Sequence, residues 1–168
     1  MNQVYEDFIT EIIEDLINTL PKFNDFNIEK QPKFNKLVEE RTIITKPDVV
    51  LCQNRNEYPF VIDTKYKKDP ANADYYQVIA YSLALRDCKA CCLIYPKSEK
   101  QAIETQQNNV LTLVRDLTRD DPQKVKLYSR TVDLYLDDED IIDYDEYINR
   151  IKEQVKEILL DLIYEGSG

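Results

Sequence analysis

The chain has only two glycines among its 168 residues, Gly166 and Gly168, and both lie at the extreme C-terminus. Glycine is the residue that tight turns and close backbone approaches to a phosphate require. A P-loop, a G-x-G-x-x-G dinucleotide turn and a G-x-S-x-G nucleophile elbow all need glycines inside the fold. The sequence therefore excludes all three of these site types.

Histidine is absent as well, which narrows the chemistry further. Ser-His-Asp and Cys-His catalysis, histidine-ligated zinc and the H-E-x-x-H motif are excluded. Any catalysis must use carboxylates, lysines, tyrosines, cysteines or a bound ion. The length, with 43% hydrophobic and 32% charged residues, is typical of one globular domain that folds without disulfides or metals. We assign that domain to residues 1–165 and treat residues 166–168 as a tail.

The charge of the chain is unevenly distributed along the sequence. The net charge is −10, which taken as a sum argues against a phosphate-binding surface. Between Lys30 and Lys68, however, nine Lys and Arg residues face only five Asp and Glu residues, whereas three basic and twelve acidic residues lie between Asp133 and Glu165. We therefore expect the middle of the chain to offer a phosphate-facing surface and the C-terminal segment to repel one.

The four cysteines fit a reduced, cytoplasmic protein. Residues 1–20 are amphipathic and acidic rather than a signal peptide, and no apolar run is long enough to span a membrane. Cys88-x-x-Cys91-Cys92, with Cys52 upstream, could also indicate an iron–sulfur or zinc site. Adjacent cysteines on a strand point to opposite faces, so we favour small buried hydrophobic side chains.

Hydrophobic periodicity predicts an α/β fold with a mixed sheet flanked by helices. Three segments have helical spacing, a fourth is an interrupted helix, and the remaining apolar runs are typical of strands. The predicted helices are residues 2–20, 73–86, 103–117 (interrupted) and 141–164, and the extended segments are residues 27–52, 60–66, 90–95 and 125–136. In the second helix we expect Tyr76, Ile79, Ala80 and Leu83 on one side. The strands around that helix should be parallel, and the preceding hairpin antiparallel.

Three charged residues lie where two neighbouring strands of this hairpin should meet. Asp48 opens one strand, and Asp63 ends the next, with Lys65 two residues beyond it. Residues i and i+2 of an extended chain point to the same side, so Asp63 and Lys65 project together, and the hairpin can bring Asp48 beside them. Two close carboxylates repel each other unless a hard cation such as Mg²⁺ neutralises them. The lysine could then orient a water or stabilise a phosphate.

An ordinary hairpin carrying a surface Asp–Lys ion pair is the alternative interpretation. Against it, Asp63 follows the apolar run Phe60-Val61-Ile62, which is typical of a central strand. The Pro47-Asp48 pair also opens a strand at the right distance. We therefore favour a site.

Four spaced motifs resemble those of the PD-(D/E)xK nuclease superfamily. Pro47-Asp48 followed by Asp63-Thr64-Lys65 matches the signature itself, and Gln77-Val78-Ile79-Ala80-Tyr81 matches the QxxxY motif of the RecB-like branch. Within it, the chain is most similar to the nuclease domain of McrC, the cleavage subunit of the McrBC modified-cytosine restriction system. The segments that carry the likeness are residues 46–51, 61–67, 76–81 and 93–96, and residues 4–9 resemble the helix that opens that domain.

The resemblance implies a restriction-endonuclease-like core of order αβββαβ and a Mg²⁺-dependent DNA endonuclease, with Mn²⁺ as a substitute. It implies that Asp48, Asp63 and the Thr64 carbonyl bind the metal and that Lys65 activates or positions water. Family likeness also implies recruitment by a McrB-type AAA+ GTPase. Assembly into a homo-oligomer stays open.

Gln77, Tyr81 and Glu6 are the remaining site candidates. Gln77 and Tyr81 are neighbours on one helix face and form a polar stripe with Asp74, either over the metal site or facing solvent. Glu6 falls inside the apolar arc of its helix, where an unpaired carboxylate is costly. It is either a metal ligand, a support for one, or a residue at the edge of the arc that reaches solvent.

Two other functions are compatible with these motifs. One is an independent nuclease for repair or mobile-element defence. The other is a catalytically silent nuclease fold that binds DNA or assembles a complex, although the presence of Asp48, Asp63 and Lys65 together argues against it.

Overall fold

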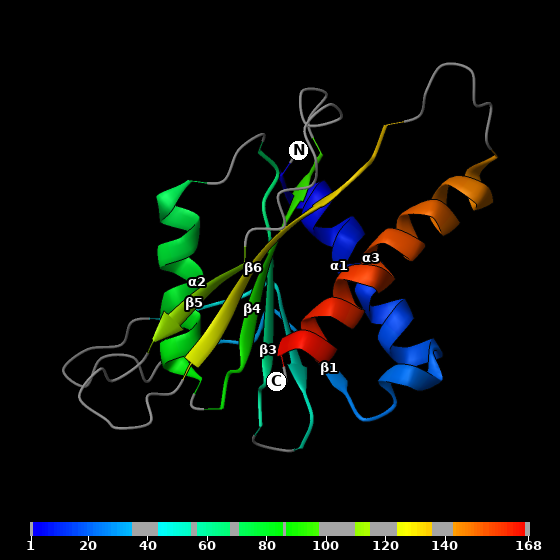
Figure 1. Cartoon of the computed structure of the whole chain (residues 1–168). Coiled ribbons are helices and arrows are strands. Elements are labelled where there is room, and N and C mark those ends of the chain that lie inside the picture. The colour runs from blue at the N-terminus through cyan, green and yellow to red at the C-terminus, as the bar shows by residue number, and fades with distance from the viewer. Residues whose placement is uncertain are drawn as a thin grey trace.

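The described strands form a single six-stranded mixed sheet in the order β1-β2-β3-β4-β6-β5, covered by helices on both faces (Figure 1). The computed structural model describes residues 2–34, 44–54, 57–67, 71–85, 87–97, 110–114, 124–135 and 143–166. In chain order the elements are α1 (Asn2–Thr19), the short 3₁₀ helix η1 (Pro21–Phe23), β1 (Asn27–Lys30), β2 (Val49–Cys52), β3 (Phe60–Thr64), α2 (Asn72–Ala84), β4 (Ala90–Pro96), β5 (Val110–Val114), β6 (Lys124–Val132) and α3 (Tyr144–Gly166). The α/β fold with a restriction-endonuclease-like core is confirmed.

Two hydrophobic cores lie on the two faces of this sheet. On one face, α1 and α3 pack together over side chains such as Phe60 and Ile62. On the other face, α2 packs over their strand neighbours, including Val61. Alternation along the strands also separates the adjacent cysteines, because Cys92 belongs to the first core and Cys91 to the second. All four cysteines are buried thiols, as expected from the sequence.

The expected order αβββαβ is present from α1 to β4. Strands β2 and β3 are antiparallel, and β3 and β4 are parallel with α2 as the crossover between them. Strand β6 then adds to β4 in parallel, and α3 follows it, so the expected last strand and last helix are both present. The strand ends at Val132, since the described residues 133–135 beyond it are not in a strand. Residues 35–43 of the expected extended segment 27–52 lie outside the described residues, as do residue 86 of the expected second helix, residue 136 of the expected last strand and residues 141 and 142 of the expected last helix.

The expected helix over residues 103–117 is wrong where the structure describes it. Val110–Val114 is strand β5, which pairs antiparallel with β6 at the edge of the sheet. The run Val-Leu-Thr-Leu-Val is short and rich in β-branched residues, which favour strands. Its partner β6 supplies the pairing that the local sequence pattern does not show. Residues 103–109 and 115–117 lie outside the described residues.

The expected apolar side of α2 is also wrong, because the helix is rotated. Tyr76 is 68% exposed and Leu83 is 55% exposed, whereas Val78 and Tyr81 face the sheet. The polar residues Asp74 and Ser82 are buried with them. Both polar side chains have hydrogen-bond partners there: Tyr95 of β4 donates to Asp74, and Ser82 donates to Ile79 O within the helix. A count of apolar residues cannot reveal such partners.

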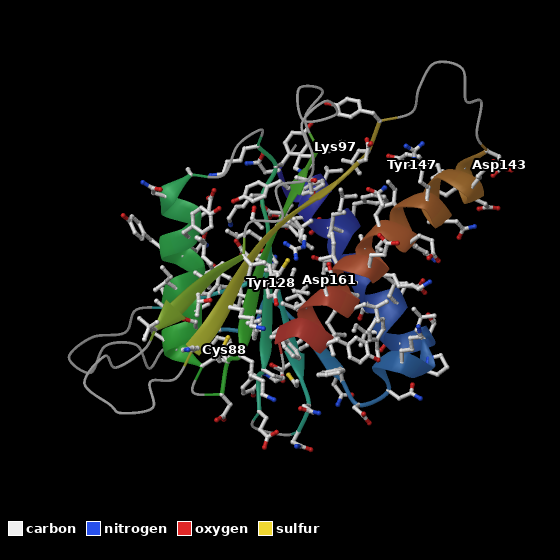
Figure 2. All side chains as sticks on the ribbon, viewed as in Figure 1. Cys88, Lys97, Tyr128, Asp143, Tyr147 and Asp161 are labelled. Atoms are coloured by element: carbon white, nitrogen blue, oxygen red, sulfur yellow. The ribbon has the colours of Figure 1, made fainter. Side chains whose placement is uncertain are left out.

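Arg130 of β6 lies buried beneath α3 and joins the two elements. It is 7% exposed, and its guanidinium carbon lies 4.9 Å from the centre of the Tyr128 ring. Its Nε lies 3.7 Å from Oδ2 of Asp161 on α3. Figure 2 shows Tyr128 and Asp161 on neighbouring elements. A cation stacked on an aromatic ring and facing a carboxylate anchors the long helix to the sheet.

Asp74, at the start of α2, ties this helix to the segment that follows β3. Its carboxylate accepts hydrogen bonds from Lys67 Nζ (2.6 Å), the Ala71 backbone N–H (2.9 Å) and the Tyr95 hydroxyl (3.0 Å). Burial acts to raise the pKa of Asp74, but these hydrogen bonds outweigh burial and lower it below its ordinary value. These hydrogen bonds join the start of α2 to Lys67, just beyond β3, and to Tyr95 of β4.

Replacing Asp74 should therefore destabilise the protein. We expect Asp74→Asn to lower the free energy of unfolding by about 1–3 kcal/mol at pH 7, because a charged acceptor of three hydrogen bonds is lost. A lowered pKa means that the contribution is full above the ordinary pKa near 4 and disappears as the pH falls below it. Urea unfolding at pH 7 and near pH 3.5 measures both effects. The exposed Asp25 gives the control Asp25→Asn, and equal stability of the two variants would contradict this role.

Candidate active site

The charged residues predicted from the sequence meet at one end of the sheet. Strand β3 ends there and β2 begins there, because the two strands are antiparallel. Lys65 donates its backbone N–H to Ile94 O of the parallel strand β4 (2.9 Å), so β4 ends at the same edge. Figure 2 labels Lys97, just after β4, at this edge, and Cys88, just before β4, at the opposite one.

Asp63 is the most buried charged group of this edge. It is 1% exposed, and its Oδ2 forms an ion pair with Lys65 Nζ but receives no well-aligned hydrogen bond. Burial raises the pKa of Asp63 to about 6, and the negative charge of Asp48 adds to this effect, while Lys65 opposes it. The expected projection of Asp63 and Lys65 to the same side is thus present, and Asp48 lies close enough to repel Asp63.

Asp48 lies just before β2 and is held by Thr64. Its Oδ2 accepts hydrogen bonds from the Thr64 backbone N–H (2.7 Å) and from Thr64 Oγ1 (2.8 Å). The Asp48 backbone carbonyl accepts a further bond from the Gln31 N–H (2.8 Å), and Gln31 has a positive φ of 48°. Backbone and side chain of Asp48 are therefore both fixed by neighbouring strands.

Glu6 of α1 faces this edge from the helical layer. An open pocket of about 260 Å³ is lined by Glu6 and Asp48 together with residues of α1 and the end of β1. Burial, followed by the charge of Asp48, raises the pKa of Glu6 above its ordinary value, while Lys65 opposes this effect. Glu6 is half-buried, so it lies at the border of the site rather than in its centre.

Gln77 and Tyr81 of α2 interact with each other and with the segment before Asp48. Gln77 Nε2 donates to the Tyr81 hydroxyl (2.5 Å), which in turn donates to Lys46 O (3.2 Å). Tyr81 is 2% exposed, and burial, followed by the charge of Asp63, raises its pKa above its ordinary value, so the hydroxyl keeps its proton. Their expected proximity is present. Asp74 does not join them, because it is engaged by Lys67 and Tyr95.

Three contributions to this edge were not foreseen from the sequence. They are the Thr64 hydroxyl, the Lys46 carbonyl and the Gln31 backbone N–H, which act on Asp48 or on the chain beside it. Two of them are backbone groups, which no residue type reveals. The hydroxyl had a signal, since Thr64 stands between the two charged residues of the D-x-K motif, but the side chain of x alternates to the other face.

The donor chemistry of this edge fits a hard divalent cation. The described residues contain no group of three or more His, Cys, Asp and Glu side chains that could hold a metal ion. Mg²⁺, however, is commonly bound through one or two carboxylates with water and substrate oxygens. Asp48 and Asp63 supply two mutually repelling carboxylates, and one buried oxygen of Asp63 lacks a well-aligned donor.

The Thr64 carbonyl fits the same chemistry. The register that pairs Val49 with Ile62 places Pro47 opposite Thr64 two residues further along. Because proline has no N–H, Pro47 cannot donate the ladder hydrogen bond to that carbonyl. The oxygen is therefore left suitable for a cation.

Comparison with known proteins gives one match. A family model described as "McrBC 5-methylcytosine restriction system component" matches residues 1–96, more than half of the chain. No curated protein and no solved structure matches the chain significantly. Among the described helices, none has the length and apolar character needed to cross a membrane.

The buried charge of Asp63 should make the metal-free protein less stable than its neutral variant. We expect Asp63→Asn to raise the free energy of unfolding by about 1–3 kcal/mol at pH 7, because the side chain then resembles the protonated acid. A carboxyl with a raised pKa loses stability as the pH rises from its ordinary pKa near 4 through about 6. The gain should therefore be full above pH 6 and shrink toward pH 4.

Urea unfolding in EDTA at pH 7 and pH 4.5 tests this expectation. Asp25→Asn, in an exposed turn, controls for the loss of one charge from an acidic chain. A variant that is less stable than the parent at pH 7 would show that the Lys65 ion pair outweighs burial.

Proposed function

The chain belongs to the McrBC 5-methylcytosine restriction system component family, and from this premise we propose that it is a metal-dependent DNA endonuclease. We assign it to the PD-(D/E)xK superfamily and its QxxxY branch, as a nuclease of the McrC type that hydrolyses phosphodiester bonds. One observation carries the proposal most strongly. It is the placement of Asp48, Asp63 and Lys65 at one sheet edge, with the two carboxylates close enough to raise the pKa of Asp63.

In this proposal Asp48, Asp63 and the Thr64 carbonyl hold Mg²⁺, with Mn²⁺ as a substitute. The bound ion would neutralise phosphate charge and make a coordinated water more acidic. Glu6, at the border of the pocket that Asp48 also lines, supports this group from α1. All of these ligands are oxygens, which is the donor type that both ions prefer.

Lys65 contributes the positive charge that the reaction needs. Its side chain is partly exposed to solvent, and its ammonium forms an ion pair with the buried Asp63. A cation in this position can orient a water for in-line attack and stabilise charge on the phosphate. Gln77 and Tyr81 act one step away, since their hydrogen bonds to each other and to Lys46 O hold the segment that carries Asp48.

Membership in a restriction-system family implies partners within that system. We propose DNA as the substrate and a McrB-type AAA+ GTPase as the protein that recruits the nuclease. A stand-alone repair or defence nuclease would share the same site and differ in lacking this partner. A catalytically silent fold would bind DNA or a partner without cleaving, and the experiment below separates it.

Loss of any one of the three charged groups should abolish or greatly reduce cleavage. We expect Asp48→Asn and Asp63→Asn to remove Mg²⁺-dependent nicking of supercoiled plasmid, and Lys65→Met to slow it by about 100- to 1,000-fold, because each removes charge from the reacting centre. Gel electrophoresis of plasmid incubated with Mg²⁺, Mn²⁺ or EDTA gives the rates.

Lys152 provides a matched control for the lysine variant. It forms an ion pair with Asp15 (2.7 Å) between α3 and α1, remote in sequence from the motif. Lys152→Met should nick plasmid at the parent rate. A parent chain with no metal-dependent nicking, or an Asp63→Asn variant with full activity, would favour the silent fold.

The isolated chain should bind duplex DNA weakly and with little sequence preference. The proposed site offers groups that contact the phosphate backbone, which carries no base information, and the net charge of −10 opposes DNA approach. We expect dissociation constants for random duplex DNA in the range of about 10⁻⁶–10⁻⁴ M at physiological salt. Fluorescence anisotropy with Ca²⁺ in place of Mg²⁺ measures this, and nanomolar binding of one particular sequence would contradict delivery by a partner.

A further inference from the structure

Thr64 makes two hydrogen bonds to the same oxygen of Asp48. The Thr64 backbone N–H (2.7 Å) and Oγ1 (2.8 Å) both donate to Oδ2. Among the described residues, the Asp48 side chain accepts no other hydrogen bonds. Both bonds therefore occupy one carboxylate oxygen, and Oδ1 accepts no hydrogen bond from the part of the chain that the structure describes. Hydrogen bonds to an ionised acceptor are the strong ones, so this arrangement fixes the rotation of the carboxylate.

The position of Thr64 in the sheet explains why it can do this. Lys65 bonds to β4 through its backbone N–H, so the backbone groups of Thr64, one residue earlier, point toward β2 instead. Strand β2 begins only at Val49, so no β2 residue is paired with Thr64 in the ladder. The Asp48 carboxylate takes the Thr64 N–H there and closes the end of the ladder with a side chain.

The hydroxyl of Thr64 is held as firmly as its backbone. The side chain is fully buried, and β-branching restricts its χ1 rotamer. It lies on the sheet face opposite to Asp63 and Lys65 because strand side chains alternate. Thr64 thus supports Asp48 from the face of the sheet that α1 covers, the face from which Glu6 also approaches.

We infer that Thr64 is a positioning residue that orients Asp48 by holding its Oδ2, so that Oδ1 would be the oxygen available to a cation. This inference rests on the proposed function, in which Asp48 is a metal ligand. It assigns to the middle residue of Asp63-Thr64-Lys65 a side-chain role that is separate from its backbone carbonyl. A merely structural role would instead be limited to sealing the end of the β2–β3 ladder.

The test is calorimetric titration of each variant with Mn²⁺ alone, followed by plasmid nicking over a range of Mg²⁺ concentrations. Thr64→Val keeps the backbone donor, the β-branch and the volume, and removes only the hydroxyl donor. We expect it to weaken Mn²⁺ binding by about 10- to 100-fold, as is typical when a hydrogen bond to a metal ligand is removed. Thr64→Ser restores the hydroxyl and should bind near the parent value.

Nicking by Thr64→Val should recover as Mg²⁺ is raised, because the loss lies in metal binding. Thr45 gives the matched control, since it is also buried and its Oγ1 bonds to Phe34 O (3.3 Å). Thr45→Val should leave Mn²⁺ affinity unchanged even if the melting temperature falls.

The outcomes separate this inference from the proposed function. If the parent binds Mn²⁺, Asp48→Asn does not, and Thr64→Val binds as tightly as the parent, the inference is overturned while the proposed function stands. Equal weakening by Thr64→Val and Thr64→Ser also overturns it, because the hydroxyl is then not the cause. A parent chain that binds no Mn²⁺, or an Asp48→Asn variant that binds it normally, overturns both.

Discussion

The repulsion between two carboxylates at the end of β3 is the constraint on which this edge of the molecule depends. Asp63 is buried beside Asp48 and has a raised pKa as a result of both burial and that neighbouring charge. Lys65 and the two donors of Thr64 offset part of this cost from opposite sides of the strand. A fold keeps such an unfavourable pair where something else is gained, and in the proposed function that gain is a place for a cation.

The layers around the sheet serve this edge in different ways. Helix α2 turns a polar face inward, so that Tyr81 reaches Lys46 O and Asp74 binds the segment after β3. Helix α1 brings Glu6 to the border of the site. Helix α3 is anchored through Arg130 far from the motif in sequence, and it adds bulk and negative charge to the α1 layer. The charged groups of this edge thus come from β2, β3 and α1, and α2 holds the segment before Asp48.

Much of the fold could be predicted from the sequence, because strong periodicity marks α1, α3 and the buried strands. The meeting of Asp63 and Lys65 followed from strand alternation alone. Strand β5 was mistaken for part of a helix, since its pairing with β6 is non-local. The rotation of α2 was missed because partners on the sheet, such as Tyr95 for Asp74, decide which polar residues turn inward. Hydrogen bonds from backbone donors, including the Gln31 N–H, cannot be predicted from the type of residue that provides them.

The register between β2 and β3 has a consequence for how this part of the chain can vary. Val49 pairs with Ile62 and Val50 with Val61, so the distance between Asp48 and Thr64 is set by the ladder and not by the hairpin loop that joins the strands. Residues can be inserted between Cys52 and Phe60 without moving either group, provided that the ladder keeps its partners. A slip of one residue would turn every side chain of β2 to the other face. The loop is therefore free to diverge in length, while the three residue pairs of the β2–β3 ladder must be kept.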